Sequence, residues 1–235
     1  MAVIPFPKPI EPPANTFRYP NVAQRTVVMG KTGSGKTQFG AWLLSESPFN
    51  KQPYIIMDYK RDALLGATDR IREIGLNEIP KHPGLYIVRP LPEIDDSNVE
   101  NWLWKIWKRG KTGLYFDETY MLPNDGRSTA LRALYTQGRS LHIPIIALTQ
   151  RPAWVSRFVF SEAEYYSYFH FNDSEDIKTA RRWFPSGLVE ERLPKYYSVW
   201  YDQDADNAFV LSPVPDSDTI LDHIDYRLGA RRVTL

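Results

Sequence analysis

Short apolar runs alternate with longer amphipathic stretches along most of the chain. Several runs are apolar without a break, which is typical of parallel strands buried on both faces of a sheet. The runs that predict strands are residues 26–29, 54–57, 85–88, 114–116, 144–148 and 166–171. Helices are predicted over residues 36–45, 99–108, 128–137 and 175–183. This alternation predicts an α/β domain built from βαβ units.

The two ends of the chain depart from this pattern. Six prolines within residues 1–24 oppose helix and central strand, so this segment is predicted to be an arm, separate from a domain over 25–235. The arm is interpreted as a segment lying on its own domain, as a strap onto a neighbouring protein, or as simple disorder. Toward the other end, about 194–235, an acidic turn between two apolar runs predicts a β-hairpin, and the tail from Asp216 a last helix.

Composition narrows the class of protein. The chain has 235 residues, 43% hydrophobic, which is enough for one sizeable core. Its 29 basic and 28 acidic residues nearly balance, so a nucleic-acid partner would have to be met by a local patch. The absence of cysteine excludes disulfides, cysteine-type zinc sites and thiol catalysis. The longest apolar run, 143–148, is far shorter than the roughly 20 residues of a membrane span, so none is predicted.

One segment carries a phosphate-binding motif. It reads Gly30-Lys31-Thr32-Gly33-Ser34-Gly35-Lys36-Thr37 and matches the Walker A pattern G-x-x-x-x-G-K-[ST], after a predicted strand and before a predicted helix. The glycines let backbone N–H groups turn toward phosphate oxygens, and the start of the helix adds partial positive charge. Lys36 is expected to reach the β- and γ-phosphates of ATP, and the Thr37 hydroxyl to coordinate Mg²⁺.

Two later strands end in polar residues that complement this motif. The run 114–116 ends in Asp117 and Glu118, a Walker B pattern in which Asp117 would support Mg²⁺ and Glu118 would polarise the attacking water. A glutamate at this position favours ATP hydrolysis over a kinase reaction, because a kinase must keep water out. The apolar run before Thr149 ends in Gln150, which could reach the γ-phosphate and report hydrolysis.

The ordered set of motifs resembles the FtsK–HerA superfamily of DNA-pumping ATPases. The segment 149–152 (Thr-Gln-Arg-Pro) resembles their sensor strand, and 138–140 (Gly-Arg-Ser) the arginine-bearing turn before it. Asp58 and Lys60 resemble the Asp-x-Lys element, at the Walker A′ position of the A32-like viral packaging ATPases. The resemblance covers roughly residues 26–175. It implies a P-loop NTPase fold of the RecA/FtsK type: a mostly parallel sheet flanked by helices, here with a C-terminal β-hairpin.

The resemblance also implies a homo-oligomeric ring in which a neighbour's arginine completes each ATP site. By motif position this arginine finger is Arg139, with Arg151 second and Arg127 and Arg132 as further candidates. Arg139 is alternatively a cation at a helix end. Asp58 and Lys60 either link the nucleotide state to the subunit interface or form an ordinary surface ion pair.

Contacts to double-stranded DNA are expected from basic residues near the predicted helix 99–108. These residues are Lys105, Lys108, Arg109 and Lys111, together with Arg127 in the loop after Walker B. A solvated helix end is an equally good interpretation of the first four. Because no base-reading motif is present, binding without sequence specificity is expected.

The sequence therefore predicts an ATP- and Mg²⁺-dependent DNA translocase, a viral genome-packaging motor that pumps DNA into a preformed capsid. Capsid or vertex proteins are expected as partners, in the host cytoplasm or at the packaging vertex of the virion. The alternatives are a P-loop small-molecule kinase, a nucleotide-switched assembly protein without motor activity, and a plasmid-transfer or phage-assembly ATPase of the same superfamily.

Overall fold

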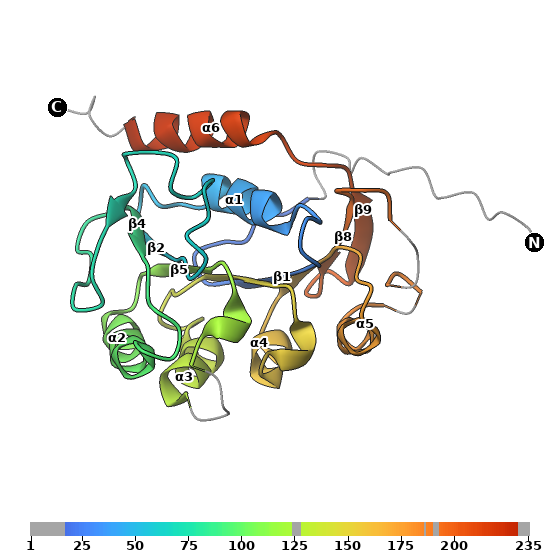
Figure 1. Ribbon diagram of the computed structural model, residues 1–235, viewed down its shortest axis with the longest axis horizontal. Helices are drawn as coiled ribbons and strands as arrows, with labels where there is room; N and C mark the ends of the chain where they lie inside the picture. The colour runs from blue at the N-terminus through green and yellow to red at the C-terminus, as the bar shows by residue number, and fades with distance from the viewer. Residues whose placement is uncertain (1–16, 124–127, 186, 190–192, 230–235) are drawn as a thin grey trace, which may run out of the picture.

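The computed structural model describes residues 17–123, 128–185, 187–189 and 193–229. In this part of the chain nine strands form one sheet between two layers of helices (Figure 1). The strands are β1 (Arg25–Met29), β2 (Pro53–Met57), β3 (Arg72–Glu73), β4 (Gly84–Val88), β5 (Gly113–Phe116), β6 (Ile145–Thr149), β7 (Tyr165–Tyr168), β8 (Ser198–Asp202) and β9 (Asn207–Leu211). The helices are α1 (Lys36–Glu46), α2 (Asp96–Arg109), α3 (Thr129–Gln137), α4 (Arg157–Ser161), α5 (Ser174–Arg181) and α6 (Ser217–Gly229), with short 3-10 turns η1 (Thr119–Met121) and η2 (Pro152–Trp154).

The strand order is β3-β4-β2-β5-β6-β1-β7-β8-β9. The first seven strands in this order are parallel, and β8 and β9 continue the sheet as an antiparallel hairpin. The order places β6 between β1 and β5, so the strands that precede the Walker A and Walker B motifs are separated by one strand. The predicted fold class, with its C-terminal hairpin and last helix, is confirmed.

The sheet is apolar on both faces, as the unbroken hydrophobic runs predicted. Every residue of β1, β2, β5, β6 and β7 is buried. The ends of the predicted strands shift by about one residue, except that β7 ends at Tyr168, not at residue 171. Among the helices, α2 begins three residues before its predicted start and α5 ends two residues before its predicted end. There Phe169 donates its N–H to the Met29 carbonyl oxygen and the chain turns beside the Walker A loop. The prediction missed β3 and α4, whose two and five residues are too short to show a period.

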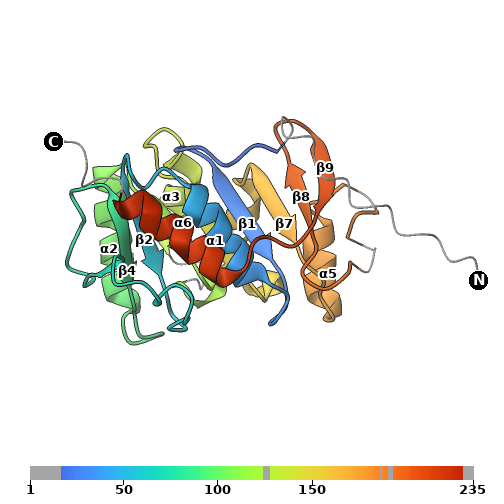
Figure 2. The ribbon, with the colours of Figure 1, turned by 90° about the horizontal axis from the view of Figure 1, so that it is seen from above.

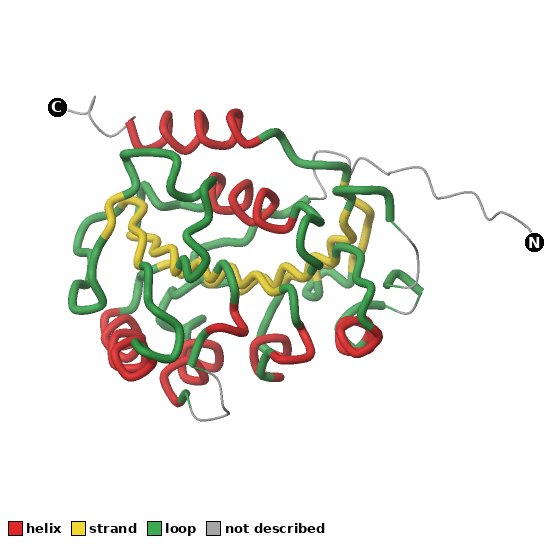
Figure 3. Tube along the Cα trace, viewed as in Figure 1, coloured by secondary structure: helices red, strands yellow, loops and turns green. Residues whose placement is uncertain are grey.

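Helices, red in Figure 3, cover both faces of the sheet, whose strands are yellow. Helices α1 and α6 lie on one face, and α2, α3, α4 and α5 lie on the other (Figure 1). Seen from above, α6 lies beside α1 (Figure 2), and the two helices are in contact. At Gly40 of α1 an added Cβ would lie 2.7 Å from the Tyr115 hydroxyl and 2.8 Å from Leu148, so glycine lets α1 approach the sheet closely.

Part of the predicted arm packs on its own domain. The ring of Phe17 contacts Trp42 of α1 and Trp200 of β8, with centroid separations of 5.4 and 5.1 Å. Arg18 forms an ion pair of 2.8 Å with Asp202. Residues 1–16 lie outside the described residues, so the strap interpretation stays a prediction for them. No helix in the described ranges is both long and apolar enough to span a membrane.

Candidate nucleotide site

The Walker A loop joins the end of β1 to the start of α1. Gly33 and Gly35 have φ values of 75° and 97°, in the left-handed region that favours glycine. A Cβ added at Gly30 would lie 2.6 Å from the Ser34 Oγ and 2.7 Å from the Phe169 Cβ, so this position also requires glycine. The loop thus leads its backbone into the start of α1, where unpaired N–H groups and the helix dipole favour a phosphate group.

The Walker B carboxylates lie beside this loop, at the carboxyl end of β5. Glu118 is fully buried, and its Oε1 lies 3.2 Å from the Lys36 Nζ. Lys60 forms a second ion pair with the same oxygen, and the Gln150 backbone N–H donates to Oε2 at 3.3 Å. The predicted catalytic glutamate and the Walker A lysine are therefore in direct contact.

Of the two Walker B carboxylates, Asp117 is the one whose ionised form is unfavourable in the folded protein. Its carboxylate is buried, and neither oxygen has a hydrogen-bond partner among the described residues. Burial, followed by repulsion from Glu118 and Asp62, raises the pKa of Asp117 to about 7. An unsatisfied buried carboxylate of this kind is well suited to a cation, which would supply the missing interaction.

Gln150 connects the loop to the segment after Walker B. Its Oε1 accepts a hydrogen bond from the Thr32 hydroxyl at 2.5 Å. Its Nε2 donates to the Tyr120 hydroxyl of η1 at 3.0 Å. A displacement of the Walker A loop is thereby coupled to η1 through one amide side chain, the arrangement that a γ-phosphate sensor requires.

Asp58 and Lys60 do not pair with each other, so the interpretation as an ordinary surface ion pair is wrong. Asp58 is fully buried, accepts the backbone N–H of Asp62 at 3.0 Å and lies 3.3 Å from the Arg89 Nε. Lys60 turns instead to Glu118. Beyond the end of β2 the chain bends at Tyr59 and Lys60, and the two side chains meet different partners.

The candidate arginine fingers lie at different edges of the sheet. Arg139 precedes β6, at the edge opposite the Walker A loop; its side chain is 64% exposed and lies 3.8 Å from Glu164. Arg151 follows β6 at the nucleotide edge, where its Nε lies 3.3 Å from Asp176 and its guanidinium 4.5 Å from the centroid of the Trp154 ring. Arg132 is exposed on α3, and Arg127 lies outside the described residues.

The predicted DNA-contact residues lie at the end of α2 and the start of β5, away from the nucleotide edge. Lys105, Lys108 and Lys111 are exposed. Arg109 is engaged within the chain: it donates to the Thr112 hydroxyl at 2.8 Å and to the Lys81 carbonyl oxygen at 3.2 Å. Its guanidinium thus secures the loop, and the three lysines remain the accessible cations of this group.

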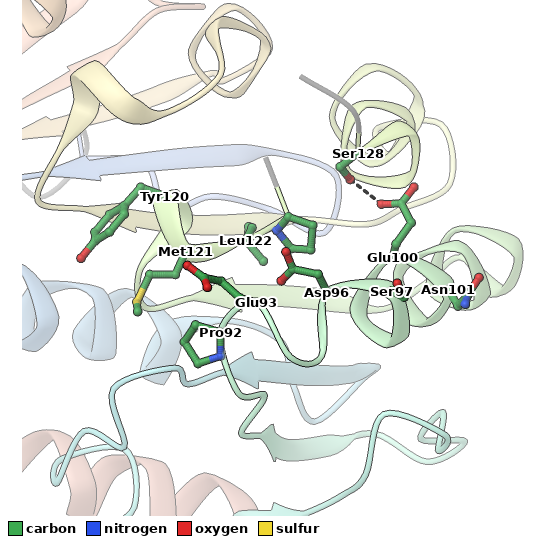
Figure 4. Close-up of a pocket in the computed structure, with 11 residues that line it drawn as sticks. Pro92, Glu93, Asp96, Ser97, Glu100, Asn101, Tyr120, Met121, Leu122 and Ser128 are labelled. Carbon is green, nitrogen blue, oxygen red and sulfur yellow. Dashed lines mark hydrogen bonds between the residues drawn. The ribbon is translucent and has the colours of Figure 1, made fainter. Parts of the chain in front are cut away.

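A cavity of about 860 Å³ lies on the β5 side of the site (Figure 4). It is enclosed by the start of α2, by η1 and by Ser128 at the start of α3. Its lining includes three carboxylates from α2 and the segment before it, those of Glu93, Asp96 and Glu100, and Glu100 accepts a hydrogen bond from the Ser128 hydroxyl at 2.6 Å. This concentration of negative charge opposes a phosphate-bearing ligand.

Several contacts of the site were not predicted from the sequence. Tyr120 bonds the sensor amide, Asp62 adds negative charge near Asp117, and Arg89 holds Asp58. Arg89 directly follows β4, and parallel strands bring their carboxyl ends to one edge, so its position at a strand end was a usable signal. Tyr120 and Asp62 belong to no motif.

The fold and this site define a P-loop NTPase in which the sensor strand lies between the Walker A and Walker B strands. No protein-family model matches the chain. The DNA packaging ATPase P9 of Enterobacteria phage PRD1 is 40% identical over 226 residues, which cover 92% of this chain and 98% of P9. The chain therefore belongs to the family of viral DNA-packaging ATPases that includes P9, as the motifs predicted.

Solved structures agree with this fold. The genome packaging NTPase B204 of Sulfolobus turreted icosahedral virus 2, in complex with AMPPCP, has a TM-score of 0.68 at 19% identity and covers 83% of this chain and 100% of B204. Its complex with ATP-gammaS has a TM-score of 0.67 at 18% identity, with the same coverage. The pCW3 conjugation coupling protein TcpA, in monomer form with ATPgS, has a TM-score of 0.58 at 14% identity and covers 89% of this chain and 65% of TcpA.

Proposed function

We propose that the chain is one subunit of a ring-shaped motor that hydrolyses MgATP and drives double-stranded DNA into a preformed capsid at the packaging vertex. The main support for this proposal is the contact between Lys36, at the end of the Walker A loop, and Glu118, the glutamate of the Walker B motif. Its family relatives are named for DNA packaging, and B204 was solved with ATP analogues. Because the chain belongs to the family of viral DNA-packaging ATPases, we no longer consider the alternative of a small-molecule kinase.

The residues present fit a Mg²⁺ ion that arrives with ATP. Asp117, buried and without a hydrogen-bond partner in the described part of the chain, and Thr37, at the start of α1, would hold it. When bound, Mg²⁺ neutralises charge on the β- and γ-phosphates. Lys36 would exchange its contact with Glu118 for the phosphates, and the Glu118 carboxylate would then accept a proton from water. Lys60 stays beside Glu118 and orients that carboxylate.

The test is steady-state ATP hydrolysis with and without long double-stranded DNA. We expect DNA to stimulate ATP hydrolysis. We expect both Lys36→Ala and Glu118→Gln to lose DNA-stimulated hydrolysis. Because Glu118→Gln keeps the shape of the side chain but removes the base, it should retain ATP binding while hydrolysis falls by about 10²-fold or more. Turnover indifferent to DNA would refute the motor. ATP binding without turnover, even with capsids and DNA present, would favour the nucleotide-switched assembly protein.

We further propose that Arg139 acts in the site of the neighbouring subunit. Its place at the sheet edge opposite the Walker A loop supports action on another chain rather than on its own. Mixing Arg139→Ala and Lys36→Ala chains tests this, because some interfaces in a mixed ring then combine an intact loop with an intact arginine. Partial return of activity is expected, and Arg151→Ala mixed in the same way is the comparison. No recovery in assembled mixed rings would refute the assignment.

We propose that DNA contacts the exposed lysines near the end of α2, which are Lys105, Lys108 and Lys111. Arg109 joins the loops that carry Lys81 and Lys111, and the Lys111 N–H donates to the Leu141 carbonyl oxygen at 2.8 Å, which holds Lys111 against the segment before β6. Replacing Lys108 and Lys111 together by Ala should lower the stimulation by DNA and its salt dependence, and leave DNA-independent hydrolysis unchanged. Lys178→Ala, an exposed lysine on α5, is the control. Unchanged stimulation would refute this contact.

A further inference from the structure

The sheet order gives the bound nucleotide a direction. The residues expected at the γ-phosphate are Glu118 and Gln150, which follow β5 and β6, both on one side of β1. The phosphate chain starts at the Walker A loop after β1, so a nucleotide with its γ-phosphate on that side must extend its nucleoside toward the opposite side. That side is formed by the segments after β7 and before β8. This reasoning rests on the proposed ATP hydrolysis.

A cavity of about 480 Å³ lies on that side and includes the Walker A loop in its wall. Its volume is within the range of small-molecule sites. Its lining includes Lys31, Ser34, Phe169, His170, Lys195 and Tyr196. None of the described lining residues is acidic, in contrast to the larger cavity beside η1. The absence of acidic side chains among its described lining residues and the direction in which the nucleotide extends therefore both favour this cavity as the nucleoside site.

Tyr196 is the most distinctive residue of this cavity. Its side chain is 46% exposed although it is aromatic, and its φ of 69° lies in the left-handed region, which is strained for a residue with a side chain. A Cβ added at Gly35 would lie 3.1 Å from the Tyr196 ring, so the ring lies directly against the phosphate loop. Tyr196 also lines a second cavity, of about 290 Å³, together with Lys36 and Thr37.

We propose that this cavity binds the purine base and ribose of ATP, and that Tyr196 is its aromatic wall. The ring stands at the point where a nucleotide leaves the phosphate loop, and aromatic side chains bind bases through their π faces. The Lys195 ammonium lies 4.7 Å from the centroid of the Tyr196 ring and adds positive charge at the rim. The left-handed backbone at Tyr196 holds the aromatic ring at the surface of the cavity, where a base can stack on it.

Binding constants for MgATP and for magnesium tripolyphosphate separate base recognition from phosphate recognition. Tyr196→Ala should weaken MgATP binding about tenfold and leave tripolyphosphate binding unchanged, because only the nucleotide has a base to stack. Tyr196→Phe should bind MgATP as the unaltered chain does. Tyr226→Ala is the matched control, since Tyr226 is 74% exposed on α6, away from the cavity.

Equal weakening of both ligands by Tyr196→Ala would overturn the proposal, since it would mean that the ring only supports the loop. Unchanged MgATP binding would overturn it as well. Failure of the unaltered chain to bind MgATP would instead refute the proposed function itself.

Photolabelling with 8-azido-ATP gives a second measurement that needs no variant. We expect the label in the peptide that contains Tyr196, and competition by ATP but not by tripolyphosphate at concentrations that leave the loop unsaturated. Label in the peptide that contains Glu93 and Asp96 would place the base in the acidic cavity and overturn the proposal.

Discussion

Replacing Asp117 by Asn should make the nucleotide-free protein more stable at neutral and higher pH, although it removes a group expected to hold Mg²⁺. The carboxylate is buried, its oxygens have no hydrogen-bond partner in the described part of the chain, and its pKa is raised to about 7. The folded chain therefore holds a proton on Asp117 more tightly than the unfolded chain does. Stability from this group is present at low pH and is lost as the pH rises through about 7.

The size of the effect follows from the two pKa values. Each tenfold difference in proton affinity corresponds to about 1.4 kcal/mol, so the rise from 3.8 to about 7 lowers the free energy of unfolding by about 4 kcal/mol once Asp117 is ionised. Of this, about 2.5 kcal/mol is lost between about pH 5 and about pH 8. The Asn variant lacks the titrating group and should not show this loss.

Urea denaturation of the nucleotide-free chain, with a metal chelator present, measures the effect. The free energy of unfolding of Asp117→Asn minus that of the unaltered chain should grow by about 2.5 kcal/mol from about pH 5 to about pH 8. Any constant cost of burying the amide cancels in this comparison. Asp222→Asn, at an exposed position on α6, is the control and should show no such growth. A difference that is independent of pH, or that shrinks as the pH rises, would refute the reasoning.

Three further substitutions test the fold and the sensor. Glu164→Gln should lower the free energy of unfolding by about 3–5 kcal/mol, because it leaves the buried Arg25 guanidinium without its carboxylate; a loss below about 1 kcal/mol in denaturant titration would contradict this. Gly40→Ala should cost about 1–3 kcal/mol, since the added methyl meets Leu148, and an unchanged melting temperature would show that the helix can move away. Gln150→Ala should lower the rate of ATP hydrolysis about tenfold at unchanged MgATP affinity, because the hydrogen bonds to the Walker A loop and to η1 are lost. Weaker MgATP binding at an unchanged rate of hydrolysis would contradict a sensor role.

The arrangement of the strands could be predicted because burial on both faces leaves a plain record in the sequence. Each central strand is an unbroken apolar run, and the residues just after β1, β5 and β6 meet at one edge because parallel strands end there together. For this reason Lys36, Asp117, Glu118 and Gln150 could be assigned to one site before any contact was known.

Other contacts depend on packing that no local pattern records. The Asp58 and Lys60 side chains separate because Arg89 and Glu118, from distant strands, each attract one of them. Arg109 looks like a free cation in the sequence, yet it donates to the Lys81 carbonyl oxygen across a loop 28 residues away. Tyr196 belongs to no motif, and only the structure shows that its ring lies against Gly35 and that its backbone is left-handed.

The position of β1 has a consequence for synthesis of the protein. β1 leaves the ribosome before the other strands of the described residues, yet its partners in the sheet are β6 and β7, where Thr26 faces Ile146 on one side and Tyr165 on the other. β1, which precedes the phosphate loop, therefore cannot pair with a neighbouring strand until β6 has been synthesised. Pairing over such sequence distances is slow, and exposed apolar strands are prone to aggregate in the interval. Nascent chains that stop before residue 145 should not capture ATP, so nucleotide binding becomes possible only late in translation.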